Sequence, residues 1–211
     1  MPVPIRTSRK RGRPARGSGG VTPTREALLR AGVVALTERG FSASGIDEIL
    51  RTVGVPKGSF YHYFASKEAF GAELIQRYAE FFAAKLDRHF GNDMLSPLNR
   101  LRSFIADAES SMKRYDFRRG CMIGNLGQEM GSLPESYRAQ LCEVFLDWQA
   151  RTACCLEAAR QAGEIPATAD PERLAAFFWL GWEGAVLRAK LERQTAPLRL
   201  FAQGFLDTLS R

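Results

Sequence analysis

The stretch SGIDEILRTVGVPKGSFYHYFASKEAF, residues 44–70, decides the fold of this chain. Ser44 and Asp47 have the spacing of a capping box, in which side-chain oxygens accept hydrogen bonds from the free N–H groups of a helix start. Apolar residues then recur at helical spacing and predict one buried helix face. Gly54 suits the end of that helix, because a left-handed cap costs glycine little, and Pro56 suits the start of the next.

A second, short helix is predicted over residues 57–64. Phe60 and Phe64 are four positions apart and therefore anchor one face to a core. The other faces carry a cation, hydroxyl groups and an imidazole, and two helices joined by a short glycine-containing turn form the helix-turn-helix that enters the major groove of DNA. Ser66 is expected to cap a further helix. The candidate DNA-contacting residues here are Ser44, Lys57, Ser59, Tyr61, His62 and Lys67.

Residues 1–20 form a basic segment with almost no apolar content, which predicts a disordered arm. Arg11-Gly12-Arg13-Pro14 resembles the core of a minor-groove arm, in which glycine lets the backbone approach the groove floor. Arg11 and Arg13 would then lie along a narrow A·T minor groove of negative potential. The alternative is a solvated basic tail without a groove contact.

The positive charge of the chain is concentrated at the same end. Residues 1–70 hold 12 Lys and Arg against 5 Asp and Glu, whereas residues 71–211 hold 18 of each kind. The formal net charge of +7 therefore belongs entirely to the first third. Such an asymmetry indicates one nucleic-acid-binding end and a neutral remainder.

The rest of the chain reads as helices separated by Gly, Pro and Asx residues, with no convincing alternation at period two. We therefore predict an all-α protein with a three-helix DNA-binding domain at residues 21–68 and a helical ligand-binding and dimerisation domain at residues 69–211. The helices expected outside residues 44–64 span about residues 24–39, 66–90, 96–115, 133–162, 170–194 and 197–209, with a short interrupted helix within 117–131.

Two long amphipathic helices near the C-terminus suit a four-helix interface between two copies of the chain. Gly181, Gly184 and Ala185 are small enough to let helices approach closely. A homodimer is expected, because a single short recognition helix makes few base contacts. The alternative is that these helices pack only within one chain.

The sequence also predicts where the chain works and what it does not bind. The first 25 residues lack the apolar run of an export signal, and no run is long enough to span a bilayer, so we expect a cytoplasmic protein without a membrane partner. The four cysteines show no C-x-x-C spacing and are expected to be free thiols. No metal and no cofactor are expected. The cysteines are Cys121, Cys142, Cys154 and Cys155.

A binding pocket is a better prediction than an active site. No G-x-S-x-G, H-E-x-x-H or phosphate-cradling loop is present, so enzyme activity is not expected. Aromatic residues mixed with few polar groups are typical of an apolar ligand cavity. The alternative is that the aromatic side chains form the core and the charged ones face solvent. The candidate pocket residues are Trp148, Trp179, Trp182, Asn125, Gln128, Glu129 and Glu183.

Cys121 is the candidate sensor residue, with Met122 beside it. It follows Arg118-Arg119-Gly120 and is predicted to open a short helix. A thiol near a helix N-terminus and two guanidinium groups would be more ionised, and therefore more nucleophilic, than an ordinary cysteine. The alternative is a small buried core thiol.

These motifs resemble a known family. The segments LLRAG (28–32), ERGF (38–41), IDEIL (46–50) and VPKGSFYHYFASKEAF (55–70) look like the DNA-binding domain of the TetR family of bacterial transcriptional regulators. Two further segments, RRGCMIGNLGQEMG (118–131) and FWLGWEGAVLRAKLE (178–192), resemble a subgroup that responds to acrylate or to electrophiles.

The resemblance implies a homodimeric repressor of a double-stranded DNA operator. A small effector, unsaturated or otherwise electrophilic, would be sensed at Cys121 and would change the separation of the two recognition helices, with the helix from residue 66 as the lever. One alternative keeps this fold with purely reversible effector binding and no cysteine chemistry. Another is a DNA-binding protein without any inducer.

Overall fold

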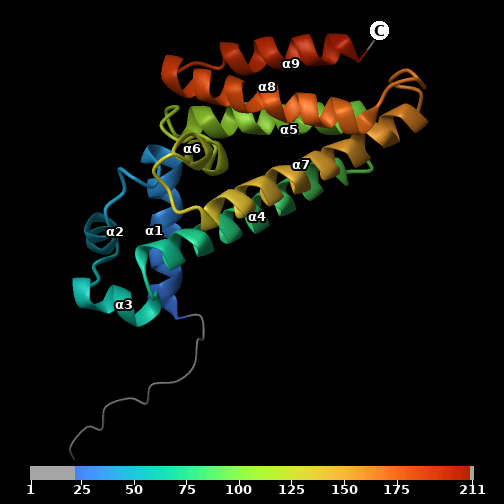
Figure 1. Cartoon of the computed structure of the whole chain (residues 1–211). Coiled ribbons are helices and arrows are strands. Elements are labelled where there is room, and N and C mark those ends of the chain that lie inside the picture. The colour runs from blue at the N-terminus through green and yellow to red at the C-terminus, as the bar shows by residue number, and fades with distance from the viewer. Residues whose placement is uncertain (1–21, 210–211) are drawn as a thin grey trace, which may run out of the picture.

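The computed structural model describes residues 22–209, which form helices and connecting turns with no strand (Figure 1). The prediction of an all-α fold is confirmed. Arg11, Arg13 and the predicted disorder of residues 1–20 lie outside the described residues. The elements are α1 (Pro23–Arg39), α2 (Ile46–Val53), the 3₁₀ turn η1 (Lys57–Ser59), α3 (Phe60–Tyr63), α4 (Lys67–Phe90), α5 (Pro97–Arg114), α6 (Met122–Gln128), α7 (Ser136–Gln161), α8 (Pro171–Glu192) and α9 (Ala196–Thr208).

The helix-turn-helix forms as the sequence predicts. Gly54 ends α2 with φ 72° and ψ 30°, the left-handed conformation expected of that glycine. Phe60 and Phe64 are 0% and 4% exposed and pack against the ring of Phe70 at the start of α4. Ser66 caps α4 by accepting a hydrogen bond from the backbone N–H of Ala69. These contacts hold α2 and α3 against α1 at one end of the molecule (Figure 1).

Two local predictions in this domain are wrong. The capping box does not form, because α2 begins after Gly45 without a side-chain cap and the Ser44 hydroxyl donates instead to the carbonyl oxygen of Gly40. The second helix is not continuous over 57–64. It opens with a 3₁₀ turn and becomes α-helical only from Phe60, which is where its anchoring side chain enters the core.

Helix α4 connects this end to the C-terminal helices. It packs against α1 at its start and then runs alongside α7, which in turn packs against α8 (Figure 1). The centre of this bundle is aromatic, with Trp148 of α7 and Trp179 of α8 at a ring separation of 4.9 Å. Because α4 belongs to both packing units, a shift along it changes both.

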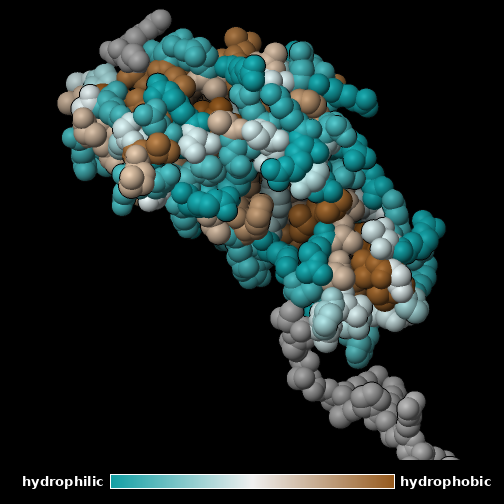
Figure 2. All heavy atoms as spheres, turned by 180° about the vertical axis from the view of Figure 1, so that it is seen from behind, coloured by the Kyte–Doolittle hydropathy of each residue, from teal (hydrophilic) through white to brown (hydrophobic). Residues whose placement is uncertain are grey.

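Exposed apolar side chains gather on the two C-terminal helices. Phe177 and Leu180 of α8 are 51% and 76% exposed, and Leu200 of α9 is 79% exposed. Figure 2 shows apolar surface at the end of the molecule where α9 finishes (upper left). Gly184 faces open space, whereas Gly181 serves the packing of α8 on α9, since a side chain there would collide with the ring of Phe201.

Candidate ligand site and DNA-binding face

The exposed face of η1 and α3 carries most of the residues predicted to contact DNA. Tyr61 is 65% exposed, and Lys57 and His62 are also exposed, while Ser59 is half-buried. Lys57 forms an ion pair of 2.8 Å with Asp47 of α2, and both partners are largely open to solvent. An exposed pair of this kind is weak, so the ammonium group is free to exchange its partner for a phosphate.

Two residues that were predicted to contact DNA instead form hydrogen bonds within the DNA-binding domain. Ser44 is 1% exposed and its hydroxyl lies 2.6 Å from the Gly40 carbonyl oxygen, so it stabilises the turn after α1 instead of facing outward. Its prediction as a DNA contact is therefore wrong. Lys67 is half-buried, with its ammonium 3.2 Å from the Phe41 carbonyl oxygen and 4.4 Å from the centre of the Phe41 ring.

A cavity of about 430 Å³ lies where α1, α4, α5 and α8 meet. Six aromatic side chains border it together with aliphatic, polar and charged ones. Apolar walls that carry oriented polar groups are typical of small-molecule sites. Lys85, Arg114 and Arg119 also border it. The residues that define its character are Tyr78, Phe82, Phe104, Cys121, Trp182 and Glu183.

A second, larger space of about 700 Å³ lies along α7 and the start of α8 and includes the exposed Cys154. It has no wall in the DNA-binding helices. The smaller cavity does, because Val33, Val34 and Thr37 of α1 line it. We therefore place the candidate ligand site at the smaller cavity.

Cys121 stands at this cavity and begins α6, as predicted. It is the N-cap of the helix, and its sulfur accepts a hydrogen bond from the backbone N–H of Gly124. The thiol is nevertheless buried, and burial together with the nearby Glu183 carboxyl raises its pKa well above the ordinary value. The prediction of a thiol activated by ionisation is therefore wrong.

The two arginines that suggested an activated thiol point elsewhere. Arg118 is exposed. The guanidinium of Arg119 lies 3.1 Å from the Glu38 carboxylate and 3.9 Å from the centre of the Tyr115 ring. The direction of the pKa shift of the Cys121 thiol is therefore set by burial and by Glu183 instead of by these guanidinium groups.

Glu183 provides the acidic group of the cavity. Its carboxyl end is tucked against Gly124, where an added Cβ would come within 2.0 Å of Oε2. It borders the same cavity as the Cys121 thiol, and burial raises its pKa to about 7. Tyr78 of α4 borders the same cavity, and its own pKa is raised by burial. Three protonatable groups therefore meet at one end of the cavity.

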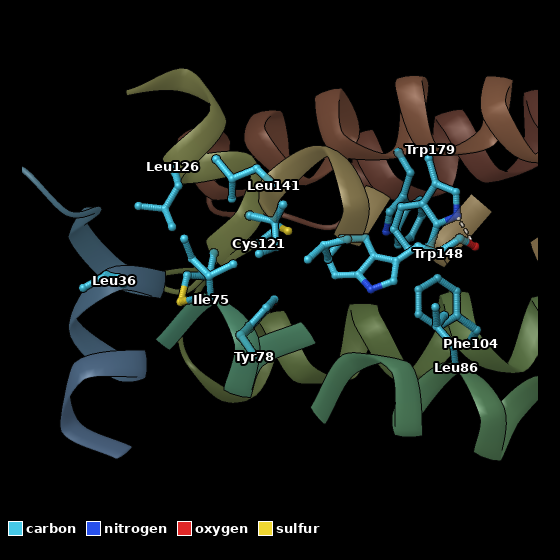
Figure 3. Close-up of a cluster of buried hydrophobic side chains, with 14 of the residues drawn as sticks. Leu36, Ile75, Tyr78, Leu86, Phe104, Cys121, Leu126, Leu141, Trp148 and Trp179 are labelled. Carbon is cyan, nitrogen blue, oxygen red and sulfur yellow. Dashed lines mark hydrogen bonds between the residues drawn. The ribbon is translucent and has the colours of Figure 1, made fainter. Parts of the chain in front are cut away.

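The predicted pocket tryptophans divide into wall and core. Trp182 borders the cavity. Trp148 and Trp179 lie together behind it (Figure 3), and the Trp179 indole donates to the Trp148 carbonyl oxygen and to the Thr152 hydroxyl. Met122 is fully buried and does not border the cavity. The prediction of Trp148, Trp179 and Met122 as ligand contacts is wrong, because packing places each of them in the core.

Asn125 of α6 and Glu129, which follows it, face the DNA-binding domain. The Asn125 side-chain amide donates to the carbonyl oxygens of Leu36 and Thr37, both at 3.0 Å. The Glu129 carboxylate accepts from the backbone N–H groups of Phe41 and Ser42, at 3.0 and 2.8 Å. Gln128 is exposed and contacts only its own helix, with Nε2 3.4 Å from the Gly124 carbonyl oxygen.

Asn125, Gln128 and Glu129 were predicted as ligand-binding residues. Gln128 and Asn125 border a much smaller space between α6 and α8, and none of the three lines the main cavity. The observed role of Asn125 and Glu129 is to join α6 to the helix-turn-helix end of the molecule.

The last turn of α1 is capped from outside its own domain. Helix ends leave carbonyl groups without intrahelical donors. Besides Asn125, the Gly120 N–H donates to the Thr37 carbonyl oxygen at 3.2 Å. The Lys190 ammonium of α8 donates to Thr37 and Glu38 at 3.2 and 2.9 Å. The segment that begins at Gly120 and holds Cys121 is therefore hydrogen-bonded directly to α1.

Sequence reasoning missed several cavity residues. Tyr78, Phe82 and Lys85 follow one another at helical spacing on α4, so their shared face was visible in the sequence, but it reads equally well as core. Phe104 of α5 gives the same ambiguous signal. The role of Lys190 had no local signal, because its partners are about 150 residues away.

Two general findings concern residues 22–209. None of their helices is long and apolar enough to cross a bilayer. No group of three or more His, Cys, Asp or Glu side chains in this part of the chain is arranged to hold a metal ion.

Comparison with known proteins gives consistent matches. Residues 28–74 match the family model for bacterial regulatory proteins of the tetR family, and residues 97–205 match the tetracyclin repressor-like C-terminal domain. The transcriptional regulator AcuR of Cereibacter sphaeroides is 52% identical, covering 93% of this chain and 89% of that protein. The transcriptional repressor NemR of Escherichia coli K12 is 31% identical, covering 83% and 88%. The crystal structure of a regulatory protein TetR from Rhodobacter sphaeroides superposes with a TM-score of 0.86 at 51% identity, covering 88% of this chain and 98% of that one.

Proposed function

This chain belongs to the TetR family of bacterial transcriptional regulators, and we propose that it is a homodimeric repressor released from its operator by a small unsaturated or electrophilic molecule. Regulators of this family bind operator DNA and small effectors and act as dimers. The effector class is the one implied by the resemblance of residues 118–131 and 178–192. The proposed site is the cavity bordered by Cys121, Tyr78 and Glu183.

The observation that carries this proposal is the hydrogen bonding between the cavity segment and the end of α1. Asn125 and the Gly120 N–H hold the carbonyl oxygens of Leu36 and Thr37, while Cys121 lies between these two donors in the sequence. An effector acts on DNA binding only through a difference in its free energy of interaction with two conformations. A molecule that displaces the start of α6 would alter the caps of α1, which gives the two conformations different energies.

The same displacement would also move α4, the second helix that connects the cavity to the DNA-binding domain. Tyr78 of α4 borders the cavity together with Cys121, and α4 packs against α1. Recognition helices of a dimer read successive major grooves when they are about 34–36 Å apart. A movement of α1 and α4 in each subunit changes that separation, so bound effector and bound operator oppose one another.

The DNA contacts proposed for each subunit are of two kinds. Tyr61 grips a phosphate, and Lys57, Ser59 and His62 lie nearer the base edges. Arg11 and Arg13 of the arm are proposed to enter the minor groove. The domain limits proposed with this function are an arm at 1–20, the helix-turn-helix at 21–68 and the effector and dimerisation domain at 69–211.

The homodimer is proposed to form through α8 and α9, where Phe177, Leu180 and Leu200 are exposed. Contiguous apolar surface of this kind marks protein interfaces. A repressor of a chromosomal operator works in the cytoplasm, and no catalytic role is proposed for the chain.

The experiment is operator binding by the purified full-length chain, with and without acrylate or a mild electrophile such as acrylamide. Release of the operator supports the proposal. Mass spectrometry of the same samples separates the covalent form, which adds the mass of the molecule at Cys121, from reversible binding. If no small molecule of this class weakens operator binding, the chain is a DNA-binding protein without such an inducer and the proposal fails.

A further inference from the structure

We propose that Glu183 accepts the proton of the Cys121 thiol as its sulfur adds to an activated alkene in the cavity. This inference rests on the proposed function and deepens it by naming the residue that makes a buried, un-ionised thiol reactive. It also replaces the two arginines as the source of that reactivity.

The geometry brings the two groups together from distant parts of the chain. Cys121 is held at the N-cap of α6 by the bond from the Gly124 N–H, and Glu183 comes from the middle of α8. Gly124 has no side chain, which leaves the room that the Glu183 carboxyl occupies. The carboxyl lies beside the thiol, because a Cβ added to Gly124 would be 2.0 Å from Glu183 Oε2 and 3.7 Å from the Cβ of Cys121, and both residues border the same cavity. A general base has to lie within hydrogen-bonding reach of the proton that it removes.

Three of the cations near the cavity are engaged by other partners. Lys85 forms an ion pair of 2.5 Å with Asp107 and Arg119 one of 3.1 Å with Glu38. Lys190, on the same helix as Glu183, donates to the carbonyl oxygens of α1. Arg88 and Arg114 also border the cavity. The groups that face the Glu183 carboxyl are the Cys121 thiol of the α6 segment and, beyond it, the Tyr78 hydroxyl of α4.

This arrangement disfavours a free thiolate. A thiolate beside an ionised Glu183 would place two negative charges in a buried site, where the charged form of each group is already penalised. Burial and the carboxyl both raise the pKa of the Cys121 thiol accordingly. The thiol can therefore react only if its proton leaves as the new bond forms, so that a thiolate and an ionised Glu183 are never present together.

Proton transfer to Glu183 supplies that route. The sulfur forms a bond to the β-carbon of the alkene while the S–H bond breaks and its proton passes to the carboxylate. The π electrons of the alkene move to the α-carbon and its activating group, and the α-carbon then takes the proton back from Glu183. The products are a thioether and the original carboxylate. With a neutral alkene, the reacting groups carry one negative charge throughout, and no oxidant or other reactant is needed.

The two mechanisms predict opposite effects of one substitution. If Glu183 acts as the base, Glu183→Gln removes the proton acceptor and slows addition. If a pre-formed thiolate reacts, Glu183→Gln removes a repelling charge, lowers the pKa of the thiol and speeds addition. The sign of the change therefore decides between them without reference to its size.

The test measures the rate of acrylamide addition at Cys121 in the full-length chain by peptide mass spectrometry between pH 5.5 and 8.5. Cys142 and Cys154 are exposed and serve as internal references within each sample. We expect the wild-type rate at Cys121 to rise through an inflection near pH 7, the pKa of Glu183, and then to level. At pH 8, Glu183→Gln should lower the rate at Cys121 by about 10²-fold and leave Cys142 and Cys154 unchanged.

Three outcomes overturn the inference: a variant rate equal to or above that of the wild type, a wild-type rate that rises tenfold per pH unit without levelling, or no addition at Cys121. The wild-type pH profile decides the matter even if the variant does not fold. Operator release is measured separately. If acrylamide releases the operator without modifying Cys121, this inference fails while the proposed function stands in its reversible form.

Discussion

The side-chain amide of Asn125 lies 3.0 Å from the carbonyl oxygen of Thr37, so a residue four positions after Cys121 caps the last turn of α1. The bond joins the beginning of the sensing segment to a helix of the DNA-binding domain. It is one of several such bonds, but it comes from a side chain and can be removed without altering the backbone. It therefore offers a direct test of how the cavity and the DNA-binding face are coupled.

Asn125→Leu should weaken that coupling. A neutral hydrogen bond contributes roughly 0.5–1.5 kcal/mol, so losing it should reduce the ratio of operator Kd with and without effector by about fivefold. The measurement is operator binding by fluorescence anisotropy, with and without effector. Gln128→Leu, on the same helix but exposed, is the matched control and should keep the wild-type ratio. An unchanged ratio in Asn125→Leu would show that coupling takes another path.

Glu183→Gln should make the folded protein more stable, and more so at high pH. Burial raises the folded pKa of Glu183 from 4.5 to about 7, so the folded state binds an additional proton between these values. Stability is therefore lost as pH rises from about 4.5 to 7, and the full cost, about 3 kcal/mol, applies above pH 7. Urea unfolding of both proteins at pH 5 and pH 8 measures the difference. A gain from the substitution that is the same at both pH values would contradict the raised pKa.

Tyr61→Phe should weaken DNA binding to a similar extent on operator and random DNA. The hydroxyl is exposed on α3 and is assigned to a phosphate, and phosphate contacts position the protein without reading sequence. The ring is kept, so its edge contact with Phe60 persists. Titration of both DNAs gives the two affinities, and a loss confined to the operator would assign Tyr61 to a base instead.

Deletion of residues 1–20 should lower DNA affinity and flatten its dependence on salt. The segment holds six cations, and each neutralised phosphate contributes about 0.9 to the slope of log K against log salt concentration. If half of the cations engage phosphates, the slope should fall by roughly 3. Binding measured across a salt series gives the slope for both proteins. The same slope in both would mean that the segment is a solvated tail.

Cys121→Ser should blunt release of the operator by electrophiles. Serine keeps the size and polarity of the side chain but replaces the nucleophilic sulfur with an unactivated hydroxyl. The measurement is operator binding over a range of acrylamide concentrations in the wild type and in the variant, with binding in its absence as the check on folding. Release of the variant at the wild-type concentration would exclude covalent sensing at Cys121 and leave reversible binding.

The sequence by itself determined the helix-turn-helix and the helical remainder, because those features depend on residues that are close together in the chain. Gly54 ends one helix through its own backbone freedom, and Phe60 and Phe64 fall on one face through their spacing. The excess of basic residues in the first third is likewise a property of composition. Features of this kind can be predicted from a short segment because they do not depend on how distant parts of the chain pack.

Only the tertiary structure decided the chemistry of the candidate site. Cys121 begins a helix as its sequence predicts, yet its pKa depends on burial and on Glu183, a residue of another helix. The sequence predicts Asn125 and Glu129 as pocket residues, whereas their partners are backbone groups nearly 90 positions earlier in the chain. The sequence shows which side chains are polar. The packing of the helices decides which group each polar side chain bonds to and how far it is shielded from solvent.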